Sequence, residues 1–426
     1  MAHQLKMKVP QLRFKGFSEE WGEKTLGEIC FIGDIDHRMP QSAANGIPYV
    51  MTGDFTGINE INFKNTKLIS NNDYEQLSKK IKPEAGDILF ARYASVGAVR
   101  YVRTQREFLV SYSCAILKNN ASFDSECLFY YLQSNGAQRQ VGLEINTGSQ
   151  RNIGIDSLKS LTAISPKIEE QNKVASLLST LDQMITLHQR KHEKLVTLKK
   201  AMLKKMFPAP GATIPEIRFK GFSEPWKEEA LGEISTNVSN NTLSRAELNN
   251  ESGLAKNIHY GDILIRFGEV LDVDKDKIPF ISNSELVSKF KAARLQNGDI
   301  IIADTAEDES VGKCAELINV GAAFVLSGLH TIAVRPTRSF ATAYLGYFMN
   351  SPAYHDQLLR LMQGTKVLSI AKTTIKQTTI FSPINESEQA KIGAYFRQLD
   401  ELIVQHSTQI EKLRQLKVSC LEKMFV

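Results

Sequence analysis

The sequence predicts an α+β protein: two tandem mixed domains, each followed by a long helix, with the two helices paired as an antiparallel coiled coil and the whole arranged as a pseudo-two-fold internal repeat. Three observations lead to this prediction. They are a long internal repeat, short apolar runs inside each copy, and a heptad-like apolar pattern at the end of each copy. At 426 residues, the chain also exceeds what one hydrophobic core usually serves.

The internal repeat has an offset of 205 at its start, where residues 9–29 and 214–234 are identical at 14 of 21 positions. The only two tryptophans, Trp21 and Trp226, occupy equivalent positions there. Shorter matches continue in the same order: Gly86–Leu89 with Gly298–Ile301, Ser95–Gly97 with Ser310–Gly312, Ser165-Pro166 with Ser382-Pro383, and Lys205–Phe207 with Lys423–Phe425. A period this long indicates a duplicated domain rather than a solenoid. The ends of the copies agree better than the middles, which favours a common frame carrying two different specificities; a duplication without functional consequence is the alternative.

The first part of each copy reads as a mixed domain, because short β-rich runs alternate with Gly, Asn, Asp and Ser clusters. The predicted strands are Asp87–Ala91, Phe108–Leu117, Ile300–Ala303 and Leu329–Val334, and helical stretches appear near Leu128–Ser134 and Tyr344–Asn350.

The second part of each copy reads as one helix of about 38 residues, or roughly 55–60 Å, over Glu169–Met206 and Glu386–Met424. Apolar or semi-apolar residues recur there in steps of three and four, as in a coiled-coil seam. In the first helix they are Val174, Leu178, Leu181, Ile185, His188, Leu195, Leu198 and Met202, and in the second Ile392, Phe396, Leu399, Ile403, His406, Ile410, Leu413, Leu416 and Cys420. Such a stripe needs a partner, which the other helix can supply by returning in the opposite direction. The alternative is that each helix packs on its own domain.

Composition narrows the class of protein. A net charge of +5 permits binding to a polyanion without demanding it. The five cysteines are dispersed, which predicts a reducing compartment and argues against a structural zinc site. Residues 1–8 do not resemble a signal peptide, and no apolar run approaches the roughly 18 residues of a membrane helix. We therefore expect a cytoplasmic protein.

Motifs that carry catalytic chemistry are missing from the sequence. It contains no G-x-x-x-x-G-K-[ST] phosphate loop, no Asn-Pro-Pro-aromatic motif of amino-methyltransferases, and no H-E-x-x-H. The carboxylate cluster at Asp272–Asp276 reads as a solvated turn, and a second cluster lies at Glu307–Glu309. The sequence predicts neither an enzyme nor a metal site.

Taken together, the chain resembles the specificity subunit of a type I restriction–modification system. The resemblance rests on the P-x-[LI]-R-F-K-G-F-S-E-x-W…L-G-E-I openings at 10–29 and 215–234, the G-D-I-[LI] segments, the helical L-D-x-[ML]-I segments at Leu181–Ile185 and Leu399–Ile403, and the K-M-F endings. It covers essentially the full length. It implies target-recognition domains at 1–165 and 209–383 and spacer helices at 166–208 and 384–426.

The resemblance also implies partners. These are double-stranded DNA with an asymmetric bipartite target, two methyltransferase subunits that modify adenine, and two motor–nuclease subunits. S-adenosylmethionine, ATP and Mg²⁺ would be bound by those partners and not by this chain. The helices would form the platform for assembly, with the positions Leu178, Leu181, Ile185, Leu195, Phe396, Leu399, Ile403 and Leu413. Two rival functions are a coiled-coil scaffold joining two protein-binding domains and a stand-alone DNA-binding regulator.

Candidate DNA contacts follow from residue type, because Arg and Lys read guanine, Asn and Gln read adenine, and hydroxyls read either. The first choice is the loop at 147–152, whose equivalent is 363–366; in similar proteins this Gly-[Ser/Thr] loop lies at the DNA face. The candidates are Arg92, Tyr93, Arg100, Tyr112 (in the strand after that of Arg92), Ser149, Gln150, Arg151 and Asn152 in the first domain and Arg266, Thr305, His330, Thr365 and Lys366 in the second. An ordinary surface or ion-pair role is the alternative for each.

Two further sets receive structural interpretations. We expect framework packing, with partner contact as the alternative, for the aromatic residues of the repeated openings: Phe14, Phe17, Trp21, Phe219, Phe222 and Trp226. We expect the solvated face of the first helix, with phosphate contact as the alternative, for Lys199, Lys200, Lys204 and Lys205.

Overall fold

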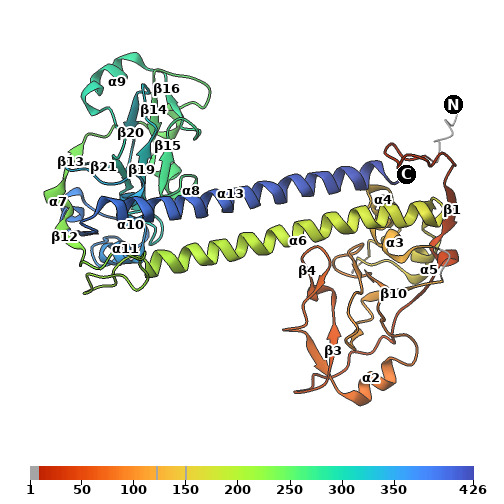
Figure 1. Ribbon diagram of the computed structural model, residues 1–426. Coiled ribbons are helices and arrows are strands. Elements are labelled where there is room, and N and C mark those ends of the chain that lie inside the picture. The colour runs from red at the N-terminus through yellow and green to blue at the C-terminus, as the bar shows by residue number, and fades with distance from the viewer. Residues whose placement is uncertain (1–8, 121–122, 149–150) are drawn as a thin grey trace. The chain divides into compact units, whose positions relative to one another are not determined.

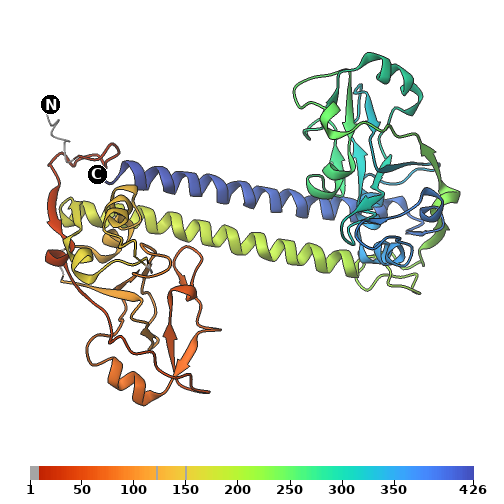
Figure 2. The same cartoon turned by 180° about the vertical axis from the view of Figure 1, so that it is seen from behind.

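The structure, a computed structural model, describes residues 9–120, 123–148 and 151–426. It divides into two compact units, which are best followed separately in Figures 1 and 2. Unit 1 contains residues 1–190 and 406–426, and unit 2 contains residues 191–405. Each unit holds one globular domain together with part of each long helix. The predicted boundaries separate whole helices from the domains, and they remain a prediction.

The two long helices are α6 (Ile168–Lys205) and α13 (Glu386–Lys423), each of 38 residues. Both predicted helices therefore begin and end within one residue of the observed ones. Their last turns are capped by the repeated opening segments, because the Lys423 carbonyl accepts from the Leu12 N–H at 2.8 Å and the Lys205 carbonyl accepts from the Ile217 N–H at 2.9 Å. A helix end leaves such carbonyls without an internal partner. The KMF endings and the openings are thus parts of one local structure.

Within each unit the two helices run in opposite directions. In unit 1, Asp182 pairs with Lys417 at 2.7 Å, and His188 lies 2.8 Å from His406, Nδ1 to Nδ1. In unit 2, Lys199 pairs with Asp400 at 2.6 Å, and farther along the chain the ring of Phe207 stacks on that of Phe396 with centroids 5.8 Å apart. In both units, a later residue of the first helix meets an earlier residue of the second.

The predicted seam is only partly correct. Its buried members pack inside the units, and six seam positions are half-buried: His188, Leu195, Met202, Ile403, His406 and Ile410. Of the positions predicted for the assembly platform, Leu195 and Ile403 are half-buried and the others are buried: Leu178, Leu181, Ile185, Phe396, Leu399 and Leu413. Leu198 and Leu416 are wrong, because their side chains are 39% and 50% exposed. The following lysines turn inward instead, and Lys199, predicted to be solvated, has a side chain only 14% exposed.

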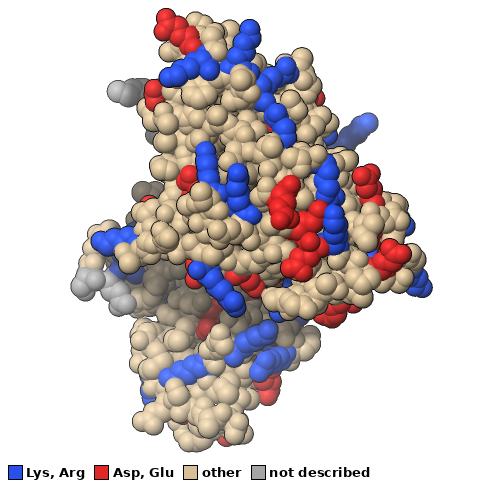
Figure 3. Space-filling view, turned by 90° about the vertical axis from the view of Figure 1, so that its left-hand side faces the viewer, with Lys and Arg blue, Asp and Glu red and all other residues tan. Residues whose placement is uncertain are grey.

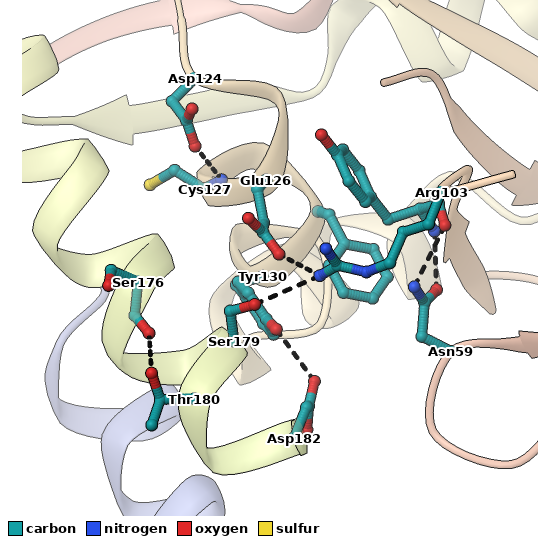
Figure 4. A network of polar contacts seen from close by, with 12 residues as sticks. Asn59, Arg103, Asp124, Glu126, Cys127, Tyr130, Ser176, Ser179, Thr180 and Asp182 are labelled. Atoms are coloured by element: carbon teal, nitrogen blue, oxygen red, sulfur yellow. Dashed lines mark hydrogen bonds and ion pairs between the residues drawn. The ribbon is translucent and has the colours of Figure 1, made fainter. Parts of the chain in front are cut away.

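Those lysines belong to a three-residue polar group that recurs in both units. In unit 1 the Tyr130 hydroxyl donates to Asp182 at 3.0 Å (Figure 4), and Lys417 pairs with the same carboxylate while lying 5.4 Å from the Tyr130 ring centroid. Burial and the neighbouring Asp182 raise the pKa of Tyr130, so the phenol stays a hydrogen-bond donor. In unit 2 the corresponding group is Tyr347, Asp400 and Lys199. Each group joins a globular domain to both long helices.

The domain of unit 1 is built on a four-stranded antiparallel sheet in the order β2-β10-β7-β8. A second sheet has the order β6-β3-β9, and β1 pairs with β11. Figure 1 shows α3 beside α6, and α2 near β3 on the side of the domain away from α6. The strands are β1 Gly22–Thr25, β2 Cys30–Gly33, β3 Ile47–Val50, β4 Phe55–Thr56, β5 Glu60–Ile61, β6 Lys67–Ile69, β7 Ile88–Ala91, β8 Val99–Tyr101, β9 Leu109–Val110, β10 Cys114–Asn119 and β11 Thr162–Ser165, and the short helices are α1 Leu26–Ile29, α2 Asn71–Leu77, α3 Ser125–Tyr131, α4 Asn135–Leu143 and α5 Ile155–Ser160.

The domain of unit 2 has the same arrangement with one more strand in its main sheet, whose order is β13-β21-β17-β19-β15. A second sheet has the order β16-β14-β20, and β12 pairs with β23. The strands are β12 Lys227–Ala230, β13 Ser235–Val238, β14 Ala255–Ile258, β15 Val270–Asp272, β16 Phe280–Ile281, β17 Ile300–Ala303, β18 Thr305–Ala306, β19 Cys314–Ile318, β20 Val325–Ser327, β21 Thr331–Pro336, β22 Leu368–Ser369 and β23 Thr379–Ser382, and the short helices are α7 Leu231–Ile234, α8 Tyr260–Ile265, α9 Ser284–Lys289, α10 Tyr344–Met349, α11 Pro352–Leu359 and α12 Lys372–Ile375. Across the described part of the chain, none of these helices, α6 and α13 included, is long and apolar enough to span a membrane.

Each main sheet separates two cores. Ile88 and Phe90 face the core that includes the long helices, whereas Leu89 between them faces the outer core. This alternation, with both faces covered, explains why the G-D-I-[LI] strands read as continuous apolar runs. One predicted strand, Phe108–Leu117, is broken at residues 111–113, so β9 and β10 lie in different sheets.

The repeated G-D dipeptides form the turn that leads into the central strands. Gly86 and Gly298 have φ of +96° and +82°, values that favour glycine. Asp87 accepts from the Glu84 N–H at 2.7 Å, and Asp299 accepts from the Gln296 N–H at 2.8 Å. The motif is therefore a framework feature and not part of a binding site.

The aromatic residues of the openings are also largely framework, as predicted. Trp21 and Trp226 are 2% and 3% exposed, and their rings contact Phe425 and Phe207 of the KMF endings, with centroids 6.5 and 6.2 Å apart. Phe14 and Phe219 pack against the cores that contain these tryptophans.

A buried carboxyl group gives unit 2 a pH-dependent stability. Glu316, on β19, is 4% exposed and accepts from the N–H groups of Ala343 and Gly346 at 2.6 and 2.9 Å. Burial raises the pKa of Glu316 to about 7, although those hydrogen bonds act in the opposite direction. The unfolded group ionises near 4.5, so the folded state binds more protons between these values. We expect the free energy of unfolding of unit 2 to fall by about 3 kcal/mol as the pH rises from 4.5 to 7.

Chemical unfolding of the full chain between pH 4.5 and 8 measures this dependence. Glu316→Gln cannot ionise, so its stability has a flatter pH profile, whatever the absolute value. Glu285→Gln, at an exposed position of α9, is the matched control and keeps the wild-type profile. Parallel profiles for wild type and Glu316→Gln contradict the assignment.

Candidate nucleic-acid interface

A loop in unit 1 folds back onto the end of the central strand β7. Asn146 and Asn152 form an isolated bridge at its base, and Asn152 also bridges Tyr93. The Ile153 N–H donates to the Arg92 carbonyl at 3.1 Å, which fixes the loop to the strand end. Arg151 is exposed on this loop. The predicted contacts Ser149 and Gln150 lie outside the described residues.

Unit 2 carries a loop of the same span in the equivalent place. Gln363 and Ser369 form the bridge at its base, and Ser369 pairs with Thr305 of β18. The Ile370 N–H donates to the carbonyl of Asp304 at 2.9 Å, as Ile153 does to Arg92 in unit 1. Thr365 and Lys366, two predicted contacts, are exposed on this loop. The repeat thus presents the two loops on equivalent strand ends.

Aromatic side chains adjoin the loop of unit 1. The imidazole of His37 stacks on Tyr112 with centroids 4.9 Å apart and planes 19° apart, and Tyr112 meets the edge of Tyr93 at 6.3 Å. The side chain of His37 is 56% exposed. Tyr112 lies in the turn at 111–113 and not in a strand as predicted, so its ring is available to this group. Sequence reasoning found both tyrosines but missed His37, which no motif marks.

The predicted base contact of Arg92 is corrected by the structure. Arg92 is only 5% exposed, forms an ion pair with Asp34, and donates from Nε to the Ile153 carbonyl at 3.0 Å. Asp34 also binds Lys80 and His37, each at 3.1 Å. Burial alone would raise the pKa of Asp34, but the hydrogen bonds from His37 and Lys80 and the Arg92 charge hold it below its usual value. Arg92 therefore supports the loop and the ionised Asp34 from inside the unit.

Arg100 is likewise committed to the fold. Its guanidinium donates to the carbonyls of Glu60, Val99 and Thr56 at 3.1, 2.7 and 3.2 Å, and it lies 5.0 Å from the Phe55 ring centroid. Burial lowers the pKa of Arg100. These bonds hold the short β4–β5 hairpin, so we replace the predicted base contact with a supporting role.

In unit 2 a histidine and a carboxylate occupy the strand end. His330, half exposed and with φ of +52°, pairs with Asp304 at 3.4 Å and meets the edge of the Tyr260 ring at 5.3 Å. Burial raises the pKa of Asp304, while His330 opposes that shift. The Thr305 hydroxyl donates to the Leu368 carbonyl at 3.0 Å, so its proton is already used within the loop. Tyr260 was missed from the sequence.

Arg266 does not join this group. Its guanidinium donates to Asp262 and to the Lys277 carbonyl, both at 2.9 Å. These contacts hold it at the end of α8, its side chain is 39% exposed, and its base contact stays a prediction.

The two sites therefore share a frame and differ in their functional groups. The strand-end residue is a buried arginine in unit 1 and a partly buried aspartate in unit 2, and the flanking aromatic residues differ as well. On the face drawn in Figure 3, Lys and Arg side chains are interspersed with acidic ones rather than gathered in one patch. Among the described residues, no three His, Cys, Asp or Glu side chains are grouped so as to hold a metal ion. The aromatic and polar side chains around the two loops offer hydrogen bonds and stacking.

Comparison with known proteins identifies the family to which the repeated domains belong. The family model described as "Type I restriction modification DNA specificity domain" matches residues 18–197 and 223–415, one match for each copy of the repeat. The chain belongs to this family of type I specificity subunits. The two segments of this specificity subunit that match the family model therefore coincide with the two copies of the internal repeat.

Individual relatives of this specificity subunit are distant. This chain is 26% identical to the type I restriction enzyme HindI specificity subunit of Haemophilus influenzae over 194 residues. This aligned segment covers 44% of this chain and 41% of the relative. This chain is 30% identical to the putative type I restriction enzyme MjaX specificity subunit of Methanocaldococcus jannaschii over 155 residues. This aligned segment covers 35% of this chain and 34% of the relative. The matched segments therefore span less than half of these curated relatives. A crystal structure of a type I restriction–modification S subunit from M. genitalium has the same fold, with a TM-score of 0.57 at 15% identity over 98% of this chain and 99% of the other.

Proposed function

We propose that this chain is the non-catalytic DNA-reading subunit of a type I restriction–modification complex and recognises an asymmetric bipartite target. One observation carries the proposal. A repeated frame presents equivalent loops in both units, yet the groups around them differ: His37 with Tyr112 in one, His330 with Asp304 in the other. Different donors and acceptors select different base edges. The two half-sites should therefore differ in sequence.

The long helices act as the spacer in this proposal. The opposite helix directions within each unit, together with the recurrence of the Tyr–Asp–Lys group, support an antiparallel coiled coil with pseudo-two-fold symmetry. Two readers related in this way contact half-sites about one helical turn apart, roughly 34–36 Å. The target-recognition domains are then residues 1–165 and 209–383, with spacer helices at 166–208 and 384–426.

The catalytic parts belong to partner subunits in this proposal. Two methyltransferase subunits assemble on the helices, and two motor–nuclease subunits join them. S-adenosylmethionine, ATP and Mg²⁺ bind those partners. The buried seam leucines pack inside each unit, so in this proposal the platform consists of the exposed helix faces. A DNA substrate places the complex in the cytoplasm.

Replacing the exposed arginine of the first loop tests the proposal. We expect Arg151→Ala to cost about 1–3 kcal/mol of DNA binding, or roughly 5- to 150-fold, and to relax one half-site only. Lys366→Ala should relax the other half-site. The readout is the set of methylated adenines in a genome that carries the chain with its methyltransferase subunits, together with binding to duplexes altered in either half-site.

Arg139→Ala removes the same charge from an exposed position of α4 in the same unit. It should leave both half-sites intact. If Arg151→Ala and Lys366→Ala relax the same half-site, or neither changes any, the assignment of one reader to each unit fails. Tight site-specific binding by the isolated chain would favour a stand-alone regulator instead.

A further inference from the structure

The repeated opening keeps its identity at exposed positions as well as buried ones. The segment Lys15-Gly16-Phe17-Ser18-Glu19 recurs unchanged as Lys220-Gly221-Phe222-Ser223-Glu224. Glycine, serine and glutamate are exposed in both copies, and the phenylalanine is half-buried in both. Packing accounts for the identity of the buried tryptophans nearby. The positive φ of Gly16 and Gly221, +97° and +93°, accounts for the shared glycine. Neither packing nor backbone conformation accounts for the identical lysine, serine and glutamate, which face solvent.

Several exposed positions near the start of the long helices have diverged. On the first turns of the two long helices, residues exposed in both copies differ at every one of four pairs: Asn172 and Ala390, Ser176 and Ala394, Thr180 and Gln398, Gln183 and Glu401. One exposed lysine in the same stretch is shared, and it is the one that contacts the opening. Lys173 lies 4.9 Å from the Phe17 ring centroid, and Lys391 lies 4.8 Å from that of Phe222.

Each opening forms one wall of a cleft against the start of a long helix. In unit 1 the cleft has a volume of about 360 Å³ and runs between residues 13–20 and 166–170. In unit 2 the cleft has a volume of about 190 Å³ and runs between residues 218–224 and 384–388. The phenylalanine lines both clefts, and its ring offers an apolar surface beside polar walls. The wall that the opening forms is thus built twice from the same residue types, whereas the wall at the start of the helix differs.

The residues that line each cleft carry more negative than positive charge, and Lys173 and Lys391 lie beside the phenylalanine rings without being part of the lining. The deep ion pairs Arg13–Glu170 and Arg218–Glu388 are neutral in sum, and in unit 1 Lys167 neutralises Glu19. Among the described residues, the remaining lining charges are Glu20 and Glu169 in unit 1 and Glu224 in unit 2. Negative walls disfavour a DNA phosphate. They favour a peptide with a basic side chain next to an apolar one.

We propose that the two clefts are equivalent docking sites for one segment of the methyltransferase subunit, so that each cleft binds one copy. The inference rests on the proposed function and adds the place and chemistry of the contact. A surface repeated without change binds the same partner twice, whereas the two DNA-reading loops differ because their half-sites differ. The docked segment carries an aromatic or aliphatic side chain that packs on the phenylalanine, flanked by Lys or Arg that meets the glutamates.

Filling the clefts tests the proposal without removing a packed group. Ser18→Arg and Ser223→Arg each place a large cation in one cleft at an exposed position. Native mass spectrometry and titration with purified methyltransferase subunit count the bound copies. We expect wild type to bind two copies, each single variant to lose one with affinity reduced roughly tenfold or more, and the double variant to lose both. Phe17→Ala and Phe222→Ala should act in the same direction.

Asn71→Arg and Ser284→Arg are matched controls, since they add the same charge at exposed first residues of the short helices α2 and α9, away from the clefts and from the long helices. They should bind two copies. If wild type binds no methyltransferase subunit, the proposed function fails. If wild type binds two copies and the double variant does too, the docking inference alone is overturned. Loss of DNA binding with assembly intact, or loss of self-association of this chain, overturns it as well.

Discussion

Arg13→Met is expected to lower the free energy of unfolding of unit 1 by about 3–5 kcal/mol, because it leaves a buried carboxylate without its counter-charge. Arg13 donates to both oxygens of Glu170 at 2.8 and 2.9 Å, and the Glu170 side chain is only 2% exposed. The hydrogen bond that Arg13 donates to Glu170 raises the pKa of Arg13, so the guanidinium stays charged. The measurement is chemical denaturation of the full chain, with a probe in each unit.

The repeat supplies a second, independent version of this experiment. Arg218 donates to Glu388 at 2.6 and 2.8 Å, and the Glu388 side chain is 1% exposed. Arg218→Met should therefore destabilise unit 2 by a similar amount. Removing both charges, as in Arg13→Met with Glu170→Leu, should restore part of the loss. A loss below about 1 kcal/mol for Arg13→Met would be typical of an exposed ion pair and would contradict the role assigned to it.

Much of the fold could be predicted from the sequence because it depends on patterns among neighbouring residues. The helix bounds follow from apolar spacing and flanking prolines, and the central strands follow from runs such as Ile300–Ala303 that are buried on both faces. The prediction that Leu198 and Leu416 are buried was wrong because it treated the two long helices as an isolated pair. Each helix segment also packs on a globular domain, which draws the lysines that follow these leucines into buried polar groups.

The site was less readable, because an arginine's role depends on partners that lie far away in the sequence. Arg92 meets Asp34, 58 residues earlier, and Arg100 binds carbonyls about 40 residues earlier. Nothing adjacent to either residue marks these partners. The loop at 147–152 was predicted because it is rich in hydrogen-bond donors and because the family resemblance places it at the DNA face. His37 had no equivalent and no motif, so only the fold could bring it to Tyr112.

A matched heptad inserted into both long helices is expected to lengthen the unread gap of the DNA target and leave both half-sites unchanged. The sequence predicts that the segment 186–200 sets the spacing. The insertion points are after Arg190 in α6 and after Gln405 in α13, where the two units meet along each helix. Seven residues add about 10.5 Å at 1.5 Å per residue, which corresponds to about 3 base pairs of duplex. A whole heptad keeps the apolar stripe on the same face.

The pairing of the helices determines the control. A heptad inserted into α6 alone shifts one helix past the other by two turns, so residues such as His188 lose their partners on α13. This variant should fail to assemble, whereas the matched variant assembles and methylates a longer site. Mapping methylated adenines reads out gap and half-sites together. An unchanged gap in the matched variant means that the helices do not set the distance. A changed half-site means that base reading is not confined to the globular domains, because the insertion leaves every residue of those domains as it was.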